Sequence, residues 1–117
     1  MSNTVVVKSV DRASVESAVE TFARSILRKR LEVVSVIWFG SWMSGTPTPE
    51  SDVDICLILS RSGKRFRDRI PDYLPGGFPV GIDLFPYTEK EFQKLAITHP
   101  GWHGAILSGR SFRGNDG

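Results

Sequence analysis

The feature that most constrains this chain is a pair of acids at the start of an apolar run. Asp52 and Asp54 are separated by one valine and lead directly into residues 55–59, Ile-Cys-Leu-Ile-Leu. In a β-strand, residues two apart point to the same face about 6.7 Å apart, so both carboxylates project together while alternate apolar side chains occupy the other face. Like charges about 4 Å apart repel by roughly 4 kcal/mol at an effective dielectric near 20, so the pair needs a cation, an arginine or a proton. Mg²⁺ meets this need, because it takes carboxylate, phosphate and water oxygens.

A second apolar run, residues 33–39, stops at Gly40-Ser41. Gly40 lets the backbone turn tightly and approach a ligand, and Ser41 offers a hydroxyl and an amide at the predicted start of a helix. Helix N-termini favour anions such as phosphate. Taken alone, Gly-Ser is most often an ordinary turn, and Asp-x-Asp is as often a solvated strand entrance. Their combination, each tied to an apolar strand, indicates a triphosphate and metal site.

A third acid follows in another apolar segment. Residues 80–85 alternate in a way that predicts a strand with Asp83 on the face opposite the aliphatic side chains. An unpaired carboxylate in a buried strand would cost several kcal/mol or become protonated, so a metal shared with Asp52 and Asp54, or an arginine, has to meet it. We therefore expect the three carboxylates on adjacent strands, within roughly 4 to 7 Å of one another, as two ions about 3.5 to 4 Å apart would require.

The remaining pattern predicts helices around these strands. Each predicted helix is marked by a cap or by apolar spacing: residues 11–30 with Asp11 or Ser14 as the cap, 61–71 with Phe66 and Ile70 facing inward, 88–96 starting at Thr88, and 102–107. Residues 33–39 predict a strand covered on both faces. This order predicts an α/β (α+β) fold, with a small mixed β-sheet flanked by helices.

The segment 61–71 is basic and has two interpretations. Its positive charges could draw a triphosphate or an RNA end toward the acids, which lie close to it in the sequence. The simpler interpretation is a solvated helix face, and the same holds for residues 28–30, Arg-Lys-Arg, at the end of the first predicted helix.

Length and composition bound the remaining possibilities. The 117 residues predict a single domain, residues 1–117, with a core at about 11–113 and a frayed end at residues 114–117. The formal net charge of +2 argues against a protein that coats nucleic acid by charge alone.

Cys56 is the only cysteine, so an intramolecular disulfide is excluded, and we expect it to pack as a small hydrophobe. No basic start precedes a long apolar run, and no stretch approaches about 20 apolar residues, so we expect a soluble cytoplasmic protein without a membrane segment.

With these residues identified, a family resemblance becomes visible. Gly40-Ser41, the intervening residues 42–51 and Asp52-x-Asp54 together resemble the signature of the polymerase-β-like nucleotidyltransferase superfamily. The short chain resembles its minimal nucleotidyltransferase branch over about residues 11–113. The resemblance implies the polymerase-β palm-like nucleotidyltransferase fold, in which a later strand supplies a third carboxylate, here Asp83.

Further residues match the branch, and one departs from it. Ser51, Gly45 and the ending at residues 105–110, Ala-Ile-Leu-Ser-Gly-Arg, are similar to the family pattern. Many minimal members carry an arginine shortly before the glycine at position 45, and this chain has Ser44 there instead. Any role of that arginine toward substrate or phosphate is therefore not expected of this position.

The resemblance implies an Mg²⁺-dependent enzyme that transfers a nucleoside monophosphate, with AMP expected, from a nucleoside triphosphate to an acceptor hydroxyl or phosphate, releasing pyrophosphate. Asp52 and Asp54 would hold two Mg²⁺ ions, one of them on the β- and γ-phosphates. Asp83 would complete the other ion and take the acceptor proton. Gly40 and Ser41 would hold the triphosphate tail.

Two other classes of function remain open. The resemblance extends to antitoxin-like binding modules that pair with an all-helical partner of the HEPN type, and it implies that the two roles coexist, because the nucleotidyltransferase can adenylylate its partner. An inactive structural domain is the other alternative, against which the three acids argue.

We expect exposed apolar residues such as Trp102 and Phe112 to form a partner surface. His99 and His103 are too isolated to predict a zinc site. A nucleic-acid acceptor and a homo-oligomer are both compatible with the sequence.

Overall fold

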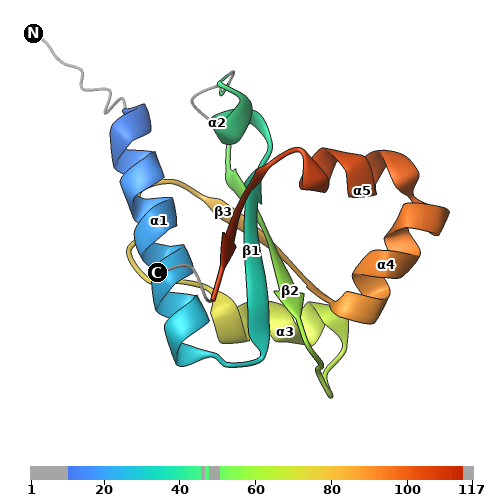
Figure 1. Cartoon of the computed structure of the whole chain (residues 1–117). Helices are drawn as coiled ribbons and strands as arrows, with labels where there is room; N and C mark the ends of the chain where they lie inside the picture. Colours follow the sequence, from blue (N-terminus) through green and yellow to red (C-terminus); the bar gives the residue numbers. More distant parts are fainter. Residues whose placement is uncertain (1–10, 46, 48–50, 115–117) are drawn as a thin grey trace, which may run out of the picture.

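The computed structural model describes residues 11–45, 47 and 51–114. Within these ranges the chain forms a four-stranded sheet with helices on both faces (Figure 1). The elements in chain order are α1 Arg12–Lys29, β1 Val33–Phe39, α2 Ser41–Ser44, β2 Val53–Leu59, α3 Phe66–Tyr73, β3 Ile82–Thr88, α4 Glu89–Thr98, α5 Pro100–Leu107 and β4 Arg110–Arg113. The strand order is β3-β2-β1-β4, with β2 and β3 parallel and the other pairs antiparallel. This confirms the predicted α/β (α+β) class with a small mixed sheet.

Two expectations concern parts of the chain that are only partly described. Of the end that was expected to fray, residues 115–117 lie outside the described residues, and Gly114 forms a turn. Among the described helices, none combines the length and the apolar character needed to cross a membrane.

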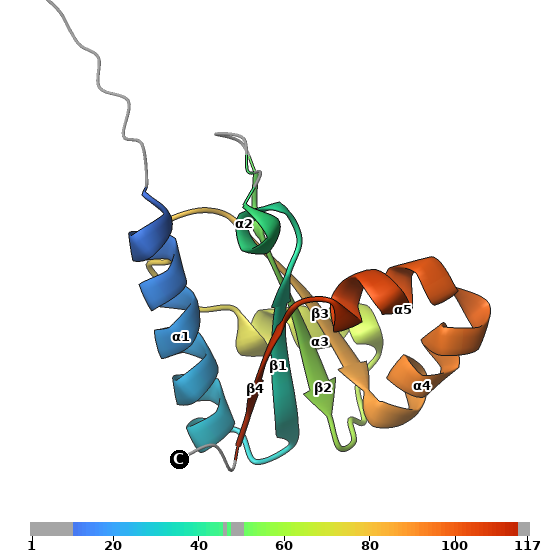
Figure 2. The same ribbon diagram turned by 45° about the horizontal axis from the view of Figure 1, so that its top comes forward.

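Helix α1 covers one face of the sheet, and α4 and α5 cover the other (Figure 2). The Asp11 side chain accepts a hydrogen bond from Ser14 N at 2.7 Å, so Asp11 is the N-cap of α1. Its buried residues recur at helical spacing: Val15, Val19, Phe22, Ala23 and Ile26. Arg28 and Lys29 lie in its last turn, where positive charge suits the helix dipole. The first predicted helix is thus confirmed, with Asp11 as its cap.

The side chains of the central strand β2 alternate between two apolar clusters. Those in the cluster under α1 are Val53, Ile55, Leu57 and Leu59. Cys56 and Ile58 belong to the cluster beneath α4 and α5, and Cys56 is buried as predicted. Because Asp54 lies two residues before Cys56, its carboxylate projects from the same face of the sheet as Cys56, near the start of β2. The acids therefore lie on the α5 side of the sheet.

Strand β3 begins later and runs further than the sequence predicts. The pattern predicts a strand over residues 80–85, whereas β3 spans Ile82–Thr88 and contains Pro86. A proline is tolerated here because β3 is at the edge of the sheet, where a missing N–H breaks no bond to an outer strand. Thr88 and Glu91 then form a capping box, with Thr88 N donating to Glu91 Oε1 at 2.9 Å and Glu91 N donating to Thr88 Oγ1 at 3.2 Å. The predicted start of α4 is confirmed, and the helix continues to Thr98.

The short strand β4 is absent from the sequence-based expectations. It pairs antiparallel with β1, with Arg110 opposite Trp38. The Arg110 guanidinium donates to Glu16 at 3.1 Å and to Glu20 at 2.6 Å, both on α1. It also lies 4.8 Å from the centre of the Phe112 ring. The end of the described chain is therefore tied both to the sheet and to α1.

The expectation that Trp102 and Phe112 are exposed is wrong. Trp102 is half-buried against Phe39 and Phe85, and Phe112 is half-buried against the cluster under α1. Other large apolar side chains are exposed: Leu31, Val34, Leu74, Ile97 and Leu107. Sequence position near the end of the chain is a poor guide to exposure here, because β4 brings that segment back onto the sheet.

The basic segment lies at the far end of the sheet from the acids. The helix expected over residues 61–71 begins only at Phe66, as α3, and it follows the end of β2, whose seven residues span about 23 Å. Its buried residues are Arg69 and Tyr73, whereas Phe66 and Ile70 are only half-buried. Arg69 donates to both carboxylate oxygens of Glu91, at 2.7 and 3.0 Å. The interpretation that this segment draws a triphosphate to the acids is therefore wrong, since a strand's length separates them.

Candidate active site

The turn between β1 and α2 requires glycine at position 40. Gly40 has a φ of 87°, a region that other residues rarely adopt. A Cβ added there would collide with Asp54 Oδ2, so the Asp54 carboxylate lies directly against the Gly40 backbone. Ser41 begins α2, a single turn of four residues whose closing bonds are Ser44 N to Gly40 O at 2.9 Å and Gly45 N to Ser41 O at 3.0 Å. The structure thus brings Gly40 to Asp54, as expected, whereas Ser41 begins α2 but is not among the residues that line the cleft beside Asp54.

The three predicted acids converge at one end of two neighbouring strands. Asp54 on β2 and Asp83 on β3 are register partners in the parallel pair, so they lie side by side. Asp52 immediately precedes β2, and its carboxylate lies so close to Gly81 that a Cβ there would collide with Asp52 Oδ1. The bond from Val53 N to Gly81 O, 2.8 Å, holds these strand ends together. Glycine at positions 40 and 81 therefore leaves room for two of the three carboxylates.

Burial and neighbouring negative charge raise the pKa of Asp54 and of Asp83. Burial, together with the negative charges of Asp83 and then Asp52, raises the pKa of Asp54 from its ordinary 3.8 to about 6. The pKa of Asp83 is also raised, by burial first and then by the charge of Asp52 and a hydrogen bond with it. Positive charge placed among the acids would reverse these shifts, because an opposite charge favours the ionised form.

The three carboxylates suit a metal ion that is also bound by oxygens of a substrate. In the part of the chain that the structure describes, no group of three or more His, Cys, Asp or Glu side chains is arranged to hold a metal ion by itself. Mg²⁺ seldom needs such a cage, since it is commonly held by one or two carboxylates together with substrate phosphates and waters. Asp52, Asp54 and Asp83 offer hard oxygen donors at an accessible strand end, so their chemistry fits Mg²⁺ bound with a triphosphate.

A cleft of about 400 Å³ opens beside Asp54. It is bounded by the ends of β1 and β2, by α2, and by α5 with the turn into β4, and its lining residues are Phe39, Gly40, Met43, Ser44, Asp54, Trp102, Ala105, Ser108 and Gly109. Its volume lies within the range of about 300 to 1,000 Å³ that small-molecule sites occupy. The contribution of α5 is not foreseen from the sequence, in which residues 105–110 match the family pattern but no role in a site is predicted for them.

Two side chains hold α2 in place over this cleft. Arg12 on α1 donates to Trp42 O at 3.0 Å and to Met43 O at 3.2 Å, which satisfies carbonyls at the end of α2. The Trp42 indole N–H donates to Ser51 O at 2.8 Å, one residue before Asp52. The Gly-Ser turn and the Asp-x-Asp strand are thereby linked directly. Arg12 lies about thirty residues earlier in the sequence, and no sequence signal marks its role.

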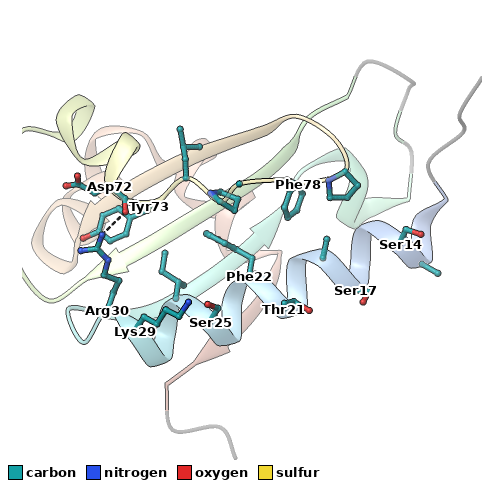
Figure 3. A pocket seen from close by; sticks show the side chains of 18 of the residues that line it. Ser14, Ser17, Thr21, Phe22, Ser25, Lys29, Arg30, Asp72, Tyr73 and Phe78 are labelled. Carbon is teal, nitrogen blue, oxygen red and sulfur yellow. Dashed lines mark hydrogen bonds between the residues drawn. The ribbon is translucent and has the colours of Figure 1, made fainter.

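A larger groove lies between α1 and residues 72–79 (Figure 3). It encloses about 870 Å³, and it is lined by the apolar side chains Phe22, Tyr73 and Phe78 and by hydroxyl side chains on α1: Ser14, Ser17, Thr21 and Ser25. None of the three acids lines it. Because α1 covers the face of the sheet opposite to Asp54, the smaller cleft is the candidate active site.

Comparison with known proteins identifies the family. A model of the nucleotidyltransferase domain matches residues 20–100, which is more than half of the 117 residues. Among solved structures, five chains match. One is a candidate nucleotidyltransferase from Sulfolobus solfataricus, solved at 1.40 Å resolution, with 19% sequence identity and a TM-score of 0.48 over 75% of this chain and 85% of that chain. No curated protein matches the chain. The family model confirms the resemblance seen in the sequence, and the chain belongs to the nucleotidyltransferase domain family.

Proposed function

We propose that this protein is an Mg²⁺-dependent nucleotidyltransferase that moves a nucleoside monophosphate, with AMP expected, from a nucleoside triphosphate to an acceptor hydroxyl, such as that of a protein partner. The observation that carries the proposal is the placement of Asp54 and Asp83 as register partners beside the Gly40 turn. Carboxylates whose pKa is raised by burial and by neighbouring carboxylates are costly for stability, and this cost is typical of sites that bind cations or move protons.

The roles follow from position and charge. Asp52 and Asp54 would supply oxygen ligands for Mg²⁺, with Asp83 as the third, and the Gly40 backbone, with Ser41 at the start of α2, would hold the triphosphate tail. When bound, Mg²⁺ would neutralise charge that develops on the phosphates during transfer. The acceptor oxygen attacks the α-phosphorus, the bond from that phosphorus to the α–β bridging oxygen breaks, and pyrophosphate leaves with the bond's electron pair.

Asp83 is the candidate base for the acceptor proton. A general base has to lie within hydrogen-bond reach of the proton that it accepts. Asp83 is exposed and lies on the edge strand, where an acceptor can reach it. Asp54 is more enclosed, against Gly40, and this position suits a ligand that stays in place.

A transfer assay tests the proposal. The protein is incubated with each of the four α-³²P-labelled nucleoside triphosphates, Mg²⁺ and cell extract as a source of acceptors. We expect label on a macromolecule: a labelled protein band identifies protein modification, and labelled RNA identifies tailing. Asp54→Asn should abolish transfer, whereas Asp68→Asn, which removes an exposed acid on α3, should retain it. Absence of transfer with all four nucleotides, or equal transfer by wild type and Asp54→Asn, contradicts the proposal.

A second candidate function is a binding module that pairs with an all-helical HEPN-type partner. The observation that favours it is the groove along α1, because that helix is 18 residues long, or about 27 Å, and carries small side chains along the groove. Co-purification with a HEPN-type protein tests this candidate. Ser17→Arg and Thr21→Arg should block pairing, while Asp54→Asn should preserve it. Pairing that survives both arginine substitutions would exclude the groove as the contact surface.

A further inference from the structure

The cleft beside Asp54 has two chemically different halves. On the side of β1, α2 and β2 are Gly40, Ser44 and the Asp54 carboxylate together with the apolar Phe39 and Met43, and on the other side are Trp102 and Ala105 of α5. Figure 1 shows α5 at the same end of the sheet as α2. Both halves of the cleft therefore lie at the end of the sheet that carries Asp54. A nucleoside triphosphate is divided in the same way, into a polyanionic tail and a flat, largely apolar base.

Trp102 is held in a fixed orientation at the apolar half. Its indole N–H donates to the Tyr87 hydroxyl at 3.0 Å. Its ring meets Phe39 and Phe85 edge-on, with centroids 5.5 and 5.1 Å apart and interplanar angles of 80° and 72°. Packing of this kind lets an aromatic side chain contribute to binding with little loss of rotamer freedom. Trp102 remains only half-buried and contributes to the cleft lining.

The rest of the apolar half consists of small residues in a hydrogen-bonded turn. Ser108 N donates to Gly104 O at 3.0 Å, and Gly109 N donates to Ile106 O at 3.0 Å. The Ser108 hydroxyl donates to Ala105 O at 2.7 Å, which leaves its oxygen as an acceptor. Small side chains at positions 105, 108 and 109 leave the space that a planar group needs, and few polar groups there distinguish one base from another.

We propose that this half of the cleft, formed by Trp102, Ala105, Ser108 and Gly109, binds the nucleoside part of the triphosphate. The inference rests on the proposed function, in which the phosphates lie at Gly40 and Asp54, and it goes further by assigning the base to α5 and the turn that follows it. Contact with an aromatic ring tolerates every base, because each has a π-face. The larger ring system of a purine covers more of the apolar lining, so purine nucleotides should bind more tightly than pyrimidine nucleotides.

The test compares a ligand that has a base with one that lacks it. Binding of ATP and of inorganic tripolyphosphate, each with Mg²⁺, is measured by calorimetry on wild type and on Ala105→Leu. Ala105 is exposed on α5, and leucine is a good helix former, so the substitution fills the cleft without disturbing the fold. We expect about tenfold weaker ATP binding, in line with the loss of one base-stacking contact, and tripolyphosphate binding within about twofold of wild type.

Three further variants separate the possible outcomes. Ala96→Leu, at an exposed position on α4, is the matched control and should leave both affinities unchanged. Trp102→Phe should weaken ATP binding alone, and Asp54→Asn should weaken both ligands. If Ala105→Leu leaves ATP binding intact, the base lies elsewhere and the inference fails while the proposed function stands. If Ala105→Leu weakens both ligands equally, the phosphates occupy this half and the inference fails. If wild type binds neither ligand, the proposed function and the inference fail together.

Discussion

Replacing Asp54 by asparagine should make the metal-free protein more stable at neutral pH. The substitution keeps the shape of the side chain and removes one of the charges that burial and the neighbouring acids disfavour. A carboxyl group whose folded-state pKa is raised, here from 3.8 to about 6, favours folding below its unfolded pKa. This contribution is lost as pH rises through about 6, so the wild type should lose stability between acidic and neutral pH.

The size of the effect follows from the shift in pKa. A rise from 3.8 to about 6 corresponds to at most about 3 kcal/mol, at 1.36 kcal/mol for each pKa unit. Solvent reaches this half-buried carboxylate and screens it. The change in the free energy of unfolding that ionisation of Asp54 causes is therefore about 1 to 2 kcal/mol. Roughly half of it falls between pH 5 and pH 7.5, so the wild type should lose about 0.5 to 1 kcal/mol over that interval.

Urea unfolding in EDTA at pH 5 and pH 7.5 measures both quantities. We expect Asp54→Asn to unfold at higher urea than the wild type at pH 7.5 and to lose most of the pH dependence. Asp11→Asn is the control, because a hydrogen bond from the Ser14 backbone lowers the pKa of Asp11, and its contribution is lost only as pH falls below about 4. That variant should keep the wild-type difference between the two pH values. A wild type whose stability is constant or rises from pH 5 to pH 7.5 would refute the reasoning.

Two other substitutions test the supports of the site, and a third tests an ion pair far from it. Gly40→Ala should destabilise the protein by at least about 1 kcal/mol and abolish transfer, because its φ is positive and its Cβ would collide with Asp54; urea unfolding and the labelled-nucleotide assay measure these effects. Arg12→Gln should cost about 1 kcal/mol and raise the KM for the triphosphate more than it lowers kcat, since it frees carbonyls at the end of α2; unchanged kinetics would contradict this role. Arg69→Met should cost about 2 kcal/mol, because it removes the guanidinium that pairs with both oxygens of the Glu91 carboxylate, yet activity per folded molecule should be unchanged when active-site titration corrects for unfolded protein.

The sequence predicts the positions of the three acids because the alternation of apolar and polar side chains along a strand is a local signal. Alternation along residues 53–59 places Asp54 opposite the side chains that pack under α1, and the structure has the same division. The Gly40 turn follows from a glycine at the end of an apolar run. Asp83 comes beside Asp54 because a parallel neighbour keeps its register, although the strand that carries Asp83 extends past Pro86.

What the sequence does not predict depends on contacts between distant segments. β4 is four residues long with an arginine at each end, so no apolar alternation marks it, and it forms because β1 offers a free edge. The cleft wall at Trp102 and Ala105 appears only when β4 brings the end of α5 back to the sheet. The basic residues of α3 are close to the acids in sequence and far from them in space, since an extended strand lies between.

Paramagnetic relaxation by Mn²⁺, used in place of Mg²⁺, tests the central claim most directly. Amide NMR spectra of the wild type are recorded with substoichiometric Mn²⁺, with and without a non-hydrolysable triphosphate analogue. We predict line broadening centred on residues 40–41, 52–54 and 83, stronger when the analogue is present, and its loss in Asp54→Asn. Broadening centred elsewhere, or broadening that persists unchanged in Asp54→Asn, would show that these three acids do not form the metal and triphosphate site.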